Sequence, residues 1–142
     1  MAVPERVEVE FRRKPNLHER LIKLVNWGEI QVLLIEPGTP EHVLYKEYTD
    51  DISANHVAMG WGESAAIAIT QVNNGILASN NLKDIRRLVA HLGIRHVMTE
   101  NILTMVYSKG IKSVGQLDVI WRDMRKNCWL PTETFSEYLA GE

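Results

Sequence analysis

The residues best placed for chemistry in this chain are Glu63 and the pair Asn80 and Asn81. Glu63 stands at the start of an Ala/Ile-rich helical segment, residues 62–72. Asn80 and Asn81 follow a short apolar strand, residues 76–78, where it runs into the next helix. In an α/β fold such a strand-to-helix junction is where ligands bind. A metal-dependent hydrolase would carry aspartates there, because hard cations prefer charged oxygen ligands, whereas this chain carries asparagines.

Composition places the chain among globular proteins. It has 142 residues, of which 45% are hydrophobic, so one domain with a substantial core is expected. No apolar run approaches the roughly 20 residues that a membrane helix needs, and the first residues lack the apolar core of a signal peptide. Cys128 is the single cysteine, which fits a reducing compartment. The sequence therefore predicts a cytoplasmic protein that does not associate with membranes.

Short apolar segments alternate with helical ones along the chain. Strands are expected at residues 6–11, 31–35, 76–78 and 94–98. Helices are expected to begin near Asn16, Pro40, Gly62, Leu82, Thr99, Ser113 and Thr132. Asn16 should cap its helix, with Glu19 as its capping-box partner, and Trp121 should lie in the core. Strands of about five residues that alternate with helices of about ten predict βαβ units and a largely parallel sheet.

The order of these motifs resembles the PIN-like domain family, in its Gly-Glu-x-x-Ala-Ile-Ala subfamily with toxin-type nuclease relatives. Residues 62–69, Gly-Glu-Ser-Ala-Ala-Ile-Ala-Ile, are similar to a helix of that family, and residues 76–83 to a strand that the family ends with paired aspartates. The segments 92–103 and 113–139 resemble the units that follow, and 21–28 and 43–47 fit more loosely. The resemblance is best supported over residues 60–139, and residues 1–14 would be a first strand and its connecting segment.

The resemblance implies a fold and a chemistry. The fold would be a single-domain α/β/α sandwich with a short parallel sheet over residues 1–142. Active members of the family hold Mg²⁺ or Mn²⁺ with three or four carboxylates at the carboxyl ends of the strands and hydrolyse RNA. There the metal would activate water and stabilise charge on the phosphate oxygens.

This sequence departs from the family pattern at the acids. The first aspartate of the family falls on or beside Leu17, the later one on Asn80, and a second acid of the 62–69 helix on Ala65. Glu47 and Glu63 are the matching acids that remain. Because opposite charge supplies most of the attraction in such a site, a reduction from four charges to two should weaken the binding of divalent cations severely.

Two further acids could compensate. Glu10 lies at the end of the first predicted strand and could replace the lost aspartate. Asp84 lies one turn after Asn80 and could reach back toward it, or it could simply be a favourable charge in the first turn of a helix. Asn80 likewise has a simpler interpretation as a helix cap. The candidate catalytic residues are Glu47, Glu63, Asn80 and Asp84, and the candidate metal ligands are Glu10, Glu47 and Glu63.

Three functions compete at this point. The first is a PIN-like module that has lost most of its metal site, needs no cofactor and acts in binding or regulation. The second is an active Mg²⁺- or Mn²⁺-dependent ribonuclease with a rearranged acidic site. The third is a structural or antitoxin-like protein in which only the surface matters. RNA or a protein is the expected partner, and a homodimer is expected because the C-terminal helices are rich in apolar residues.

Overall fold

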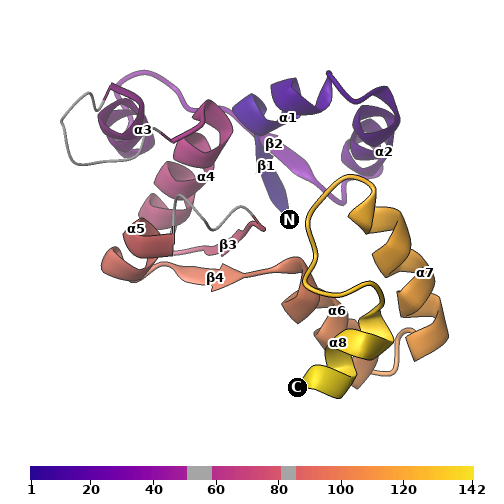
Figure 1. The fold of residues 1–142 in the computed structure, drawn as a ribbon. Helices are drawn as coiled ribbons and strands as arrows, with labels where there is room; N and C mark the ends of the chain where they lie inside the picture. Colours follow the sequence, from indigo (N-terminus) through magenta and orange to yellow (C-terminus); the bar gives the residue numbers. More distant parts are fainter. Residues whose placement is uncertain (51–58, 81–85) are drawn as a thin grey trace. The chain divides into compact units, whose positions relative to one another are not determined.

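The computed structural model describes residues 1–50, 59–80 and 86–142. These residues form two compact units: unit 1 (residues 1–50, 59–77 and 86–95) and unit 2 (residues 78–80 and 96–142). The described chain combines helices with two short parallel sheets of two strands each (Figure 1), so the predicted mixture of helix and strand is confirmed. The prediction of a single domain over residues 1–142 stays a prediction.

The elements alternate along the chain. They follow in the order β1 (Ala2–Pro4), α1 (Glu5–Phe11), α2 (Pro15–Asn26), β2 (Gln31–Leu33), α3 (Pro40–Asp50), α4 (Trp61–Val72), β3 (Ile76–Ala78), α5 (Arg86–His91), β4 (Arg95–Val97), α6 (Thr99–Ser108), α7 (Val114–Arg125) and α8 (Phe135–Gly141). Strand β1 pairs in parallel with β2, and β3 pairs with β4. The predicted strands at 31–35, 76–78 and 94–98 are therefore confirmed, the first and last in shortened form.

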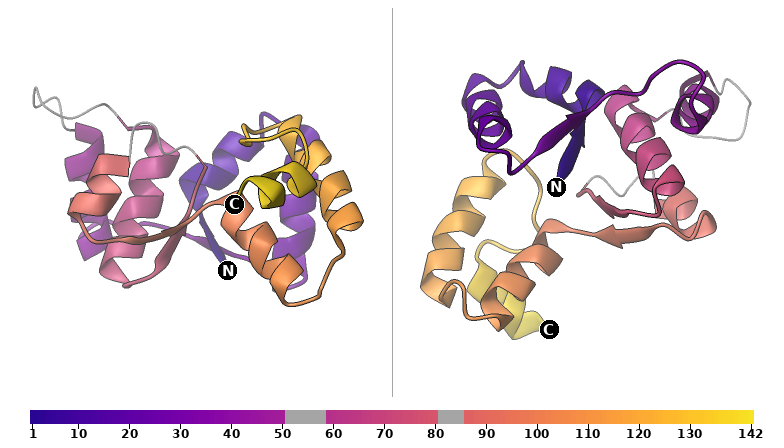
Figure 2. Two further views of the ribbon diagram at one scale, coloured as in Figure 1. Left: turned by 60° about the horizontal axis from the view of Figure 1, so that its bottom comes forward. Right: turned by 180° about the vertical axis from the view of Figure 1, so that it is seen from behind.

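Helix α4 is the centre of unit 1 and packs against α1, α3 and β1 (Figure 2). Its small and branched side chains make this possible, because Ala65, Ile67 and Ala68 are fully buried. Gly62 brings α1 especially close. A Cβ atom at this position would lie 2.7 Å from a carboxylate oxygen of Glu10 and 3.0 Å from a methyl group of Val7. The absence of a side chain at Gly62 therefore lets the two helices meet.

The prediction of a strand over residues 6–11 is wrong, because these residues belong to helix α1. The strand lies before them, in β1, and Pro4 stands at the junction between the two elements. Two acids, Glu5 and Glu8, occupy the first turn, where the helix dipole favours negative charge. The Glu8 carboxylate also accepts a hydrogen bond from Arg12, four residues later, and side chains at this spacing lie on the same face of a helix. These local interactions outweigh the apolar and charged alternation that suggested a strand.

The start of the next helix also differs from the prediction. Helix α2 begins at Pro15, and its N-cap is Lys14 with no side-chain cap, so Asn16 is not the cap. Proline is well suited to the first helical position because its fixed backbone angle matches the helix and its missing N–H would be unpaired there anyway. The predicted start at Pro40 is confirmed, and the hydroxyl of Thr39 accepts a hydrogen bond from the backbone N–H of His42 at 3.3 Å.

Unit 2 has its own apolar core, built by α6, α7 and α8. The buried side chains of this core are Leu103, Leu117, Trp121, Leu130 and Phe135. Helix α7 begins directly after Ser113, as expected, and the Ser113 hydroxyl caps it by accepting a hydrogen bond from the backbone N–H of Gln116 at 3.3 Å. The predicted core position of Trp121 is confirmed, since its side chain is fully buried.

No helix in residues 1–50, 59–80 and 86–142 is long and apolar enough to span a lipid bilayer.

Candidate functional site

Two of the predicted acids, Glu10 and Glu63, meet at the start of α4. The backbone N–H of Gly62 donates to Glu10 Oε1 at 3.3 Å, and the backbone N–H of Gly60 donates to Glu63 Oε2 at 3.2 Å. Both carboxylates therefore bind backbone N–H groups around the first turn of a helix, where such groups lack partners within the helix. Glu10 reaches this position from helix α1, and not from the end of a strand as predicted.

Glu47 lies apart from this pair, on an exposed face of α3. Its electrostatic effect falls on its neighbour: burial, and then the negative charge of Glu47, raises the pKa of Tyr48. Within the described ranges of the chain, no three His, Cys, Asp or Glu side chains are grouped so that they could hold a metal ion. The structure therefore does not assemble Glu10, Glu47 and Glu63 into the predicted metal site.

Asn80 has a structural role in unit 2. Its side-chain oxygen Oδ1 accepts a hydrogen bond from the backbone N–H of Thr99 at 2.9 Å, which caps the first residue of α6. The imidazole of His96 lies 2.9 Å from the carbonyl oxygen of Ser79 and ties the same two segments together. Asn80 is thus a cap, but of α6 and not of the helix that follows it in sequence. The candidate Asp84 lies outside the described residues.

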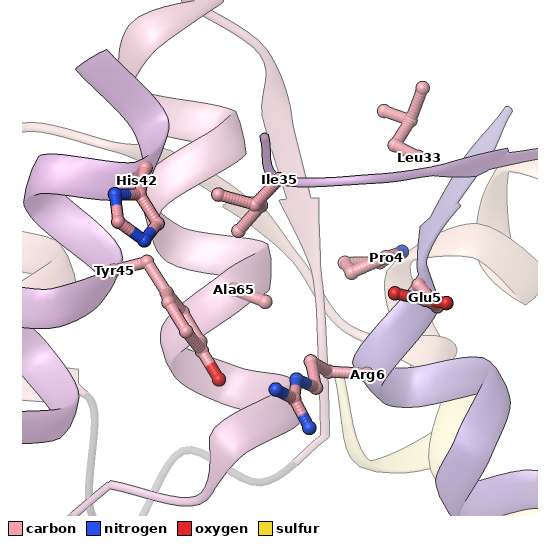
Figure 3. A pocket seen from close by; sticks show the side chains of 8 residues that line it. All are labelled: Pro4, Glu5, Arg6, Leu33, Ile35, His42, Tyr45 and Ala65. Atoms are coloured by element: carbon pink, nitrogen blue, oxygen red, sulfur yellow. The ribbon is translucent and has the colours of Figure 1, made fainter. Parts of the chain in front are cut away.

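The residue that directly follows strand β1 is Glu5, and Leu17, on or beside which the first aspartate of the family was expected, lies in α2. The carboxyl ends of the parallel strands β1 and β2 meet at a cavity of about 140 Å³, which is drawn in Figure 3. It is lined by Pro4, Glu5, Arg6, Leu33, Ile35, His42, Tyr45 and Ala65. Ligands of open parallel sheets bind at this edge, so we call this cavity the edge pocket.

Polar side chains of the edge pocket have hydrogen-bond donors that a ligand could use. The hydroxyl of Tyr45 is buried and has no hydrogen-bond partner among the described residues. It points toward the guanidinium group of Arg6 in Figure 3. That guanidinium lies 4.8 Å above the ring of Trp61, a cation–π contact that restricts its orientation. Arg6, His42 and Tyr45 were not candidates in the sequence, because Arg6 lay within the strand predicted over residues 6–11 and His42 and Tyr45 reach the pocket from helix α3.

A second polar cluster in unit 1 is built around Glu8, which is 6% exposed. Arg12 donates to it through Nε at 3.1 Å and through Nη2 at 2.8 Å, and His18 Nε2 lies 2.7 Å from Glu8 Oε1. The hydrogen bonds from Arg12, and then from His18, lower the pKa of the Glu8 carboxyl. The cluster joins α1 to α2, and its near-complete set of partners indicates a structural role.

The Glu8 cluster should make the stability of the protein depend on pH. A carboxyl whose pKa is lowered by folding stabilises the native state above its ordinary pKa, about 4.3, and this contribution is lost as the pH falls through the lowered value. Glu8→Gln should therefore lower the melting temperature near neutral pH, and its curve should converge with the wild-type curve in acid. Melting temperatures followed by circular dichroism between about pH 2 and 7 would measure this.

The matched control for this series is Glu19→Gln. Glu19 forms an ion pair with Lys23 on α2, but its side chain is 68% exposed, so it should change the stability little at any pH. A Glu8→Gln curve that runs parallel to the wild-type curve over the whole range would contradict the stabilising role of the Glu8 carboxylate.

Comparison with protein-family models, with curated proteins and with solved structures finds no match for this chain.

Proposed function

We propose that this chain is a PIN-like protein that acts as a binding or regulatory module, and not as a metal-dependent ribonuclease. The observation that carries this proposal is the edge pocket. Glu5, the residue directly after β1, lines this pocket, and so does Ala65, where the family pattern expects an acid. Glu5 is the one carboxylate among the lining residues.

The donors of the edge pocket do not fit a divalent cation. A Mg²⁺ ion is held by charged oxygen ligands, and this pocket offers one carboxylate, that of Glu5. The guanidinium of Arg6 and the imidazole of His42 line the same cavity. A guanidinium stays positively charged at any physiological pH and repels a metal cation. The same groups are well suited to hold a ligand that carries negative charge.

The remaining acids support the same proposal. Glu10 and Glu63 bind backbone N–H groups at the start of α4, and the Asn80 oxygen binds the backbone of α6. One oxygen of each of these side chains therefore already has a backbone partner. These three candidates therefore contribute to helix ends, where their substitution would destabilise the fold.

Titration with Mg²⁺ or Mn²⁺ tests this proposal. A ligand that binds the native state raises the melting temperature in a saturable way. We expect no saturable rise with either ion up to millimolar concentration, measured by differential scanning fluorimetry.

A saturable rise in that titration would contradict the proposal. If Glu5→Gln or Glu63→Gln abolished such a rise, it would also locate the metal and favour the alternative, an active ribonuclease with a rearranged acidic site. Cleavage of a labelled single-stranded RNA in the presence of the metal, absent in the same variant, would establish that alternative.

The partner of the module is proposed to be RNA or a protein, and self-association as a homodimer is proposed as well. The apolar residues of the C-terminal helices suggested the homodimer, and several of them pack against one another within unit 2. Side chains that remain exposed on unit 2 include Val119, at 66%, and Trp129, at 72%. Light scattering after size-exclusion chromatography measures the mass of the protein in solution and decides between monomer and dimer.

A further inference from the structure

We propose that the edge pocket binds a small aliphatic carboxylate, whose oxygens are held by Arg6 and Tyr45 and whose carbon chain lies against Leu33 and Ile35. This inference rests on the proposed binding or regulatory function and assigns the edge pocket a small-molecule ligand in addition to the RNA or protein partner. It depends on three observations, which are the balance of donors and acceptors, the size of the cavity and the apolar wall.

Among the side chains that line the pocket, Arg6, His42 and Tyr45 carry hydrogen-bond donors, and Glu5 is the one carboxylate. Arg6 provides a planar set of N–H groups that matches the two oxygens of a carboxylate. No carboxylate of the described residues forms an ion pair with it, while its stacking on Trp61 limits its orientation. The Tyr45 hydroxyl points toward this guanidinium and is buried without a partner among the described residues. A buried hydroxyl without a partner is uncommon, and after a small rotation of the Tyr45 side chain a ligand oxygen beside Arg6 would accept its hydrogen.

The size of the cavity limits the ligand. At about 140 Å³ it is well below the roughly 300–1,000 Å³ of pockets for drug-sized molecules. An apolar protein cavity of about 150 Å³ takes one benzene molecule, which has about six non-hydrogen atoms. A carboxylate with a short chain, such as butyrate, has this size. Larger ligands would have to extend out of the pocket.

The remaining lining distinguishes a carboxylate from a phosphate. Leu33 and Ile35 give the pocket an apolar wall, which suits a hydrocarbon chain and offers nothing to a bare phosphate. Glu5 lines the same pocket, and its negative charge would repel the second charge of a phosphate dianion more than a single carboxylate. The combination favours a monoanion with an aliphatic tail.

Titration of the ¹⁵N-labelled full chain with three probes tests this inference. Butyrate should shift the resonances of residues that line the pocket in a saturable way. Butyramide has the same shape without the charge and should bind much more weakly, and inorganic phosphate should not saturate the same resonances. Equal binding of butyramide, tighter binding of phosphate, or no saturation with butyrate would each overturn the assignment.

Two variants locate the site. Tyr45→Phe removes the unpartnered hydroxyl and should weaken butyrate binding about tenfold or more, as expected for the loss of a hydrogen bond to a charged group. The control is Ser64→Ala, because the Ser64 hydroxyl is also buried without a partner among the described residues but does not line the cavity. It should leave the affinity unchanged. A Tyr45→Phe protein that binds butyrate as tightly as the wild type would overturn the role of Tyr45.

These results are separable from those of the metal titration. If butyrate does not bind and Mg²⁺ and Mn²⁺ do not stabilise the protein, the carboxylate ligand is wrong and the binding function stands. If either metal stabilises the protein in a saturable way, the proposed function fails whatever the result with butyrate.

Discussion

Replacement of Trp121 with alanine is expected to lower the free energy of unfolding of unit 2 by about 3–5 kcal/mol, the range measured for large aromatic side chains in protein cores. Trp121 is fully buried, and its ring centroid lies 5.6 Å from that of Phe135 and 5.4 Å from that of Tyr138. Alanine would leave a large cavity at the point where α7 and α8 meet. Urea unfolding followed by far-ultraviolet circular dichroism would measure the loss.

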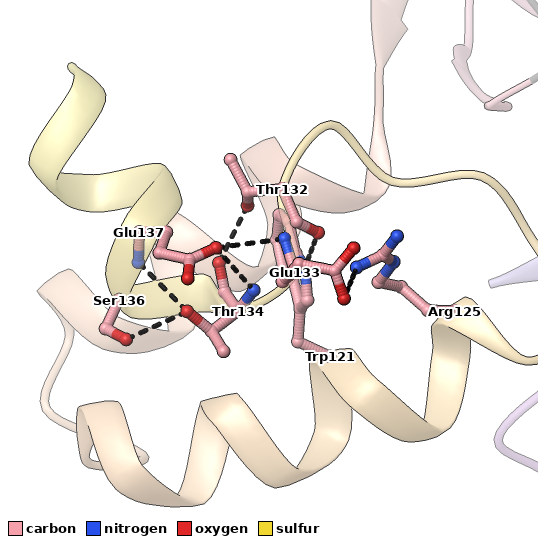
Figure 4. A network of polar contacts seen from close by, with 7 residues as sticks. All are labelled: Trp121, Arg125, Thr132, Glu133, Thr134, Ser136 and Glu137. Carbon is pink, nitrogen blue, oxygen red and sulfur yellow. Dashed lines mark hydrogen bonds and ion pairs between the residues drawn. The ribbon is translucent and has the colours of Figure 1, made fainter.

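The effect of Trp121→Ala should extend beyond apolar packing. The indole Nε1 donates to the carbonyl oxygen of Thr132 at 2.9 Å (Figure 4), so the variant also removes the partner of a backbone group in the segment that leads into α8. In the same segment Glu133 pairs with Arg125, which lowers the pKa of the Glu133 carboxyl. The indole thus fixes both the core and the path of the chain before the last helix.

Trp129→Ala is the matched control for Trp121→Ala. Trp129 has the same side chain in the same unit but is 72% exposed. Its removal should change the free energy of unfolding by no more than about 0.5 kcal/mol. Similar losses in the two variants would mean that the described core of unit 2 is incorrect.

The second large effect is expected in unit 1, at Ile67. Ile67→Ala should lower the free energy of unfolding of unit 1 by about 2–5 kcal/mol. The side chain is fully buried on α4, the helix that packs against α1, α3 and β1. Hydrogen exchange measured by mass spectrometry would localise the destabilisation, because the amides of α1 and α4 should exchange faster than in the wild type.

Ile76→Ala provides the comparison for Ile67→Ala. It removes the same atoms from a side chain that is 55% exposed in β3, so the expected loss is no more than about 1 kcal/mol. If Ile76→Ala cost as much as Ile67→Ala, the assignment of α4 as the centre of unit 1 would be wrong.

The sequence was a good guide to helices with strong start signals. Helices were expected to begin near Pro40 and Ser113, and the hydroxyls of Thr39 and Ser113 accept backbone hydrogen bonds at these two helix starts. Helix α4 was predicted because Ala and Ile fill a long segment after Gly62, and it extends over Trp61–Val72. Such signals depend on residues close together in sequence, and their physical cause is local.

The first residues of the chain form a helix where a strand was predicted from the alternation of residues. In the segment that became α1, Val7 and Phe11 are compatible both with a strand of alternating residues and with one face of a helix. The helix forms because Glu8 finds Arg12 on the same helix and His18 on the next one. The contact with His18 depends on the tertiary structure and cannot be read from a short window.

Because the first strand was predicted at residues 6–11, the edge pocket could not be predicted from the sequence. With the first strand placed at residues 6–11, Glu10 stood at a strand end, and Glu5 and Arg6 had no role. Glu63 was placed correctly at the start of a helix, but its carboxylate binds the backbone there. The orphan hydroxyl of Tyr45 has no sequence signal, because whether it has a partner is decided by the packing of α3 against α4.

The close approach at Gly62 has a consequence for selectivity. Arg6 stands on α1 and Ala65 on α4, and the two helices touch at Gly62 with no side chain of that residue between them. Helices already in steric contact cannot move nearer, and separating them would break the bond from Gly62 to Glu10. The contact at Gly62 therefore fixes the distance between helices α1 and α4. For the ligand proposed to bind the edge pocket, this fixed distance limits the width of the group that fits between the walls formed by Arg6 and Ala65.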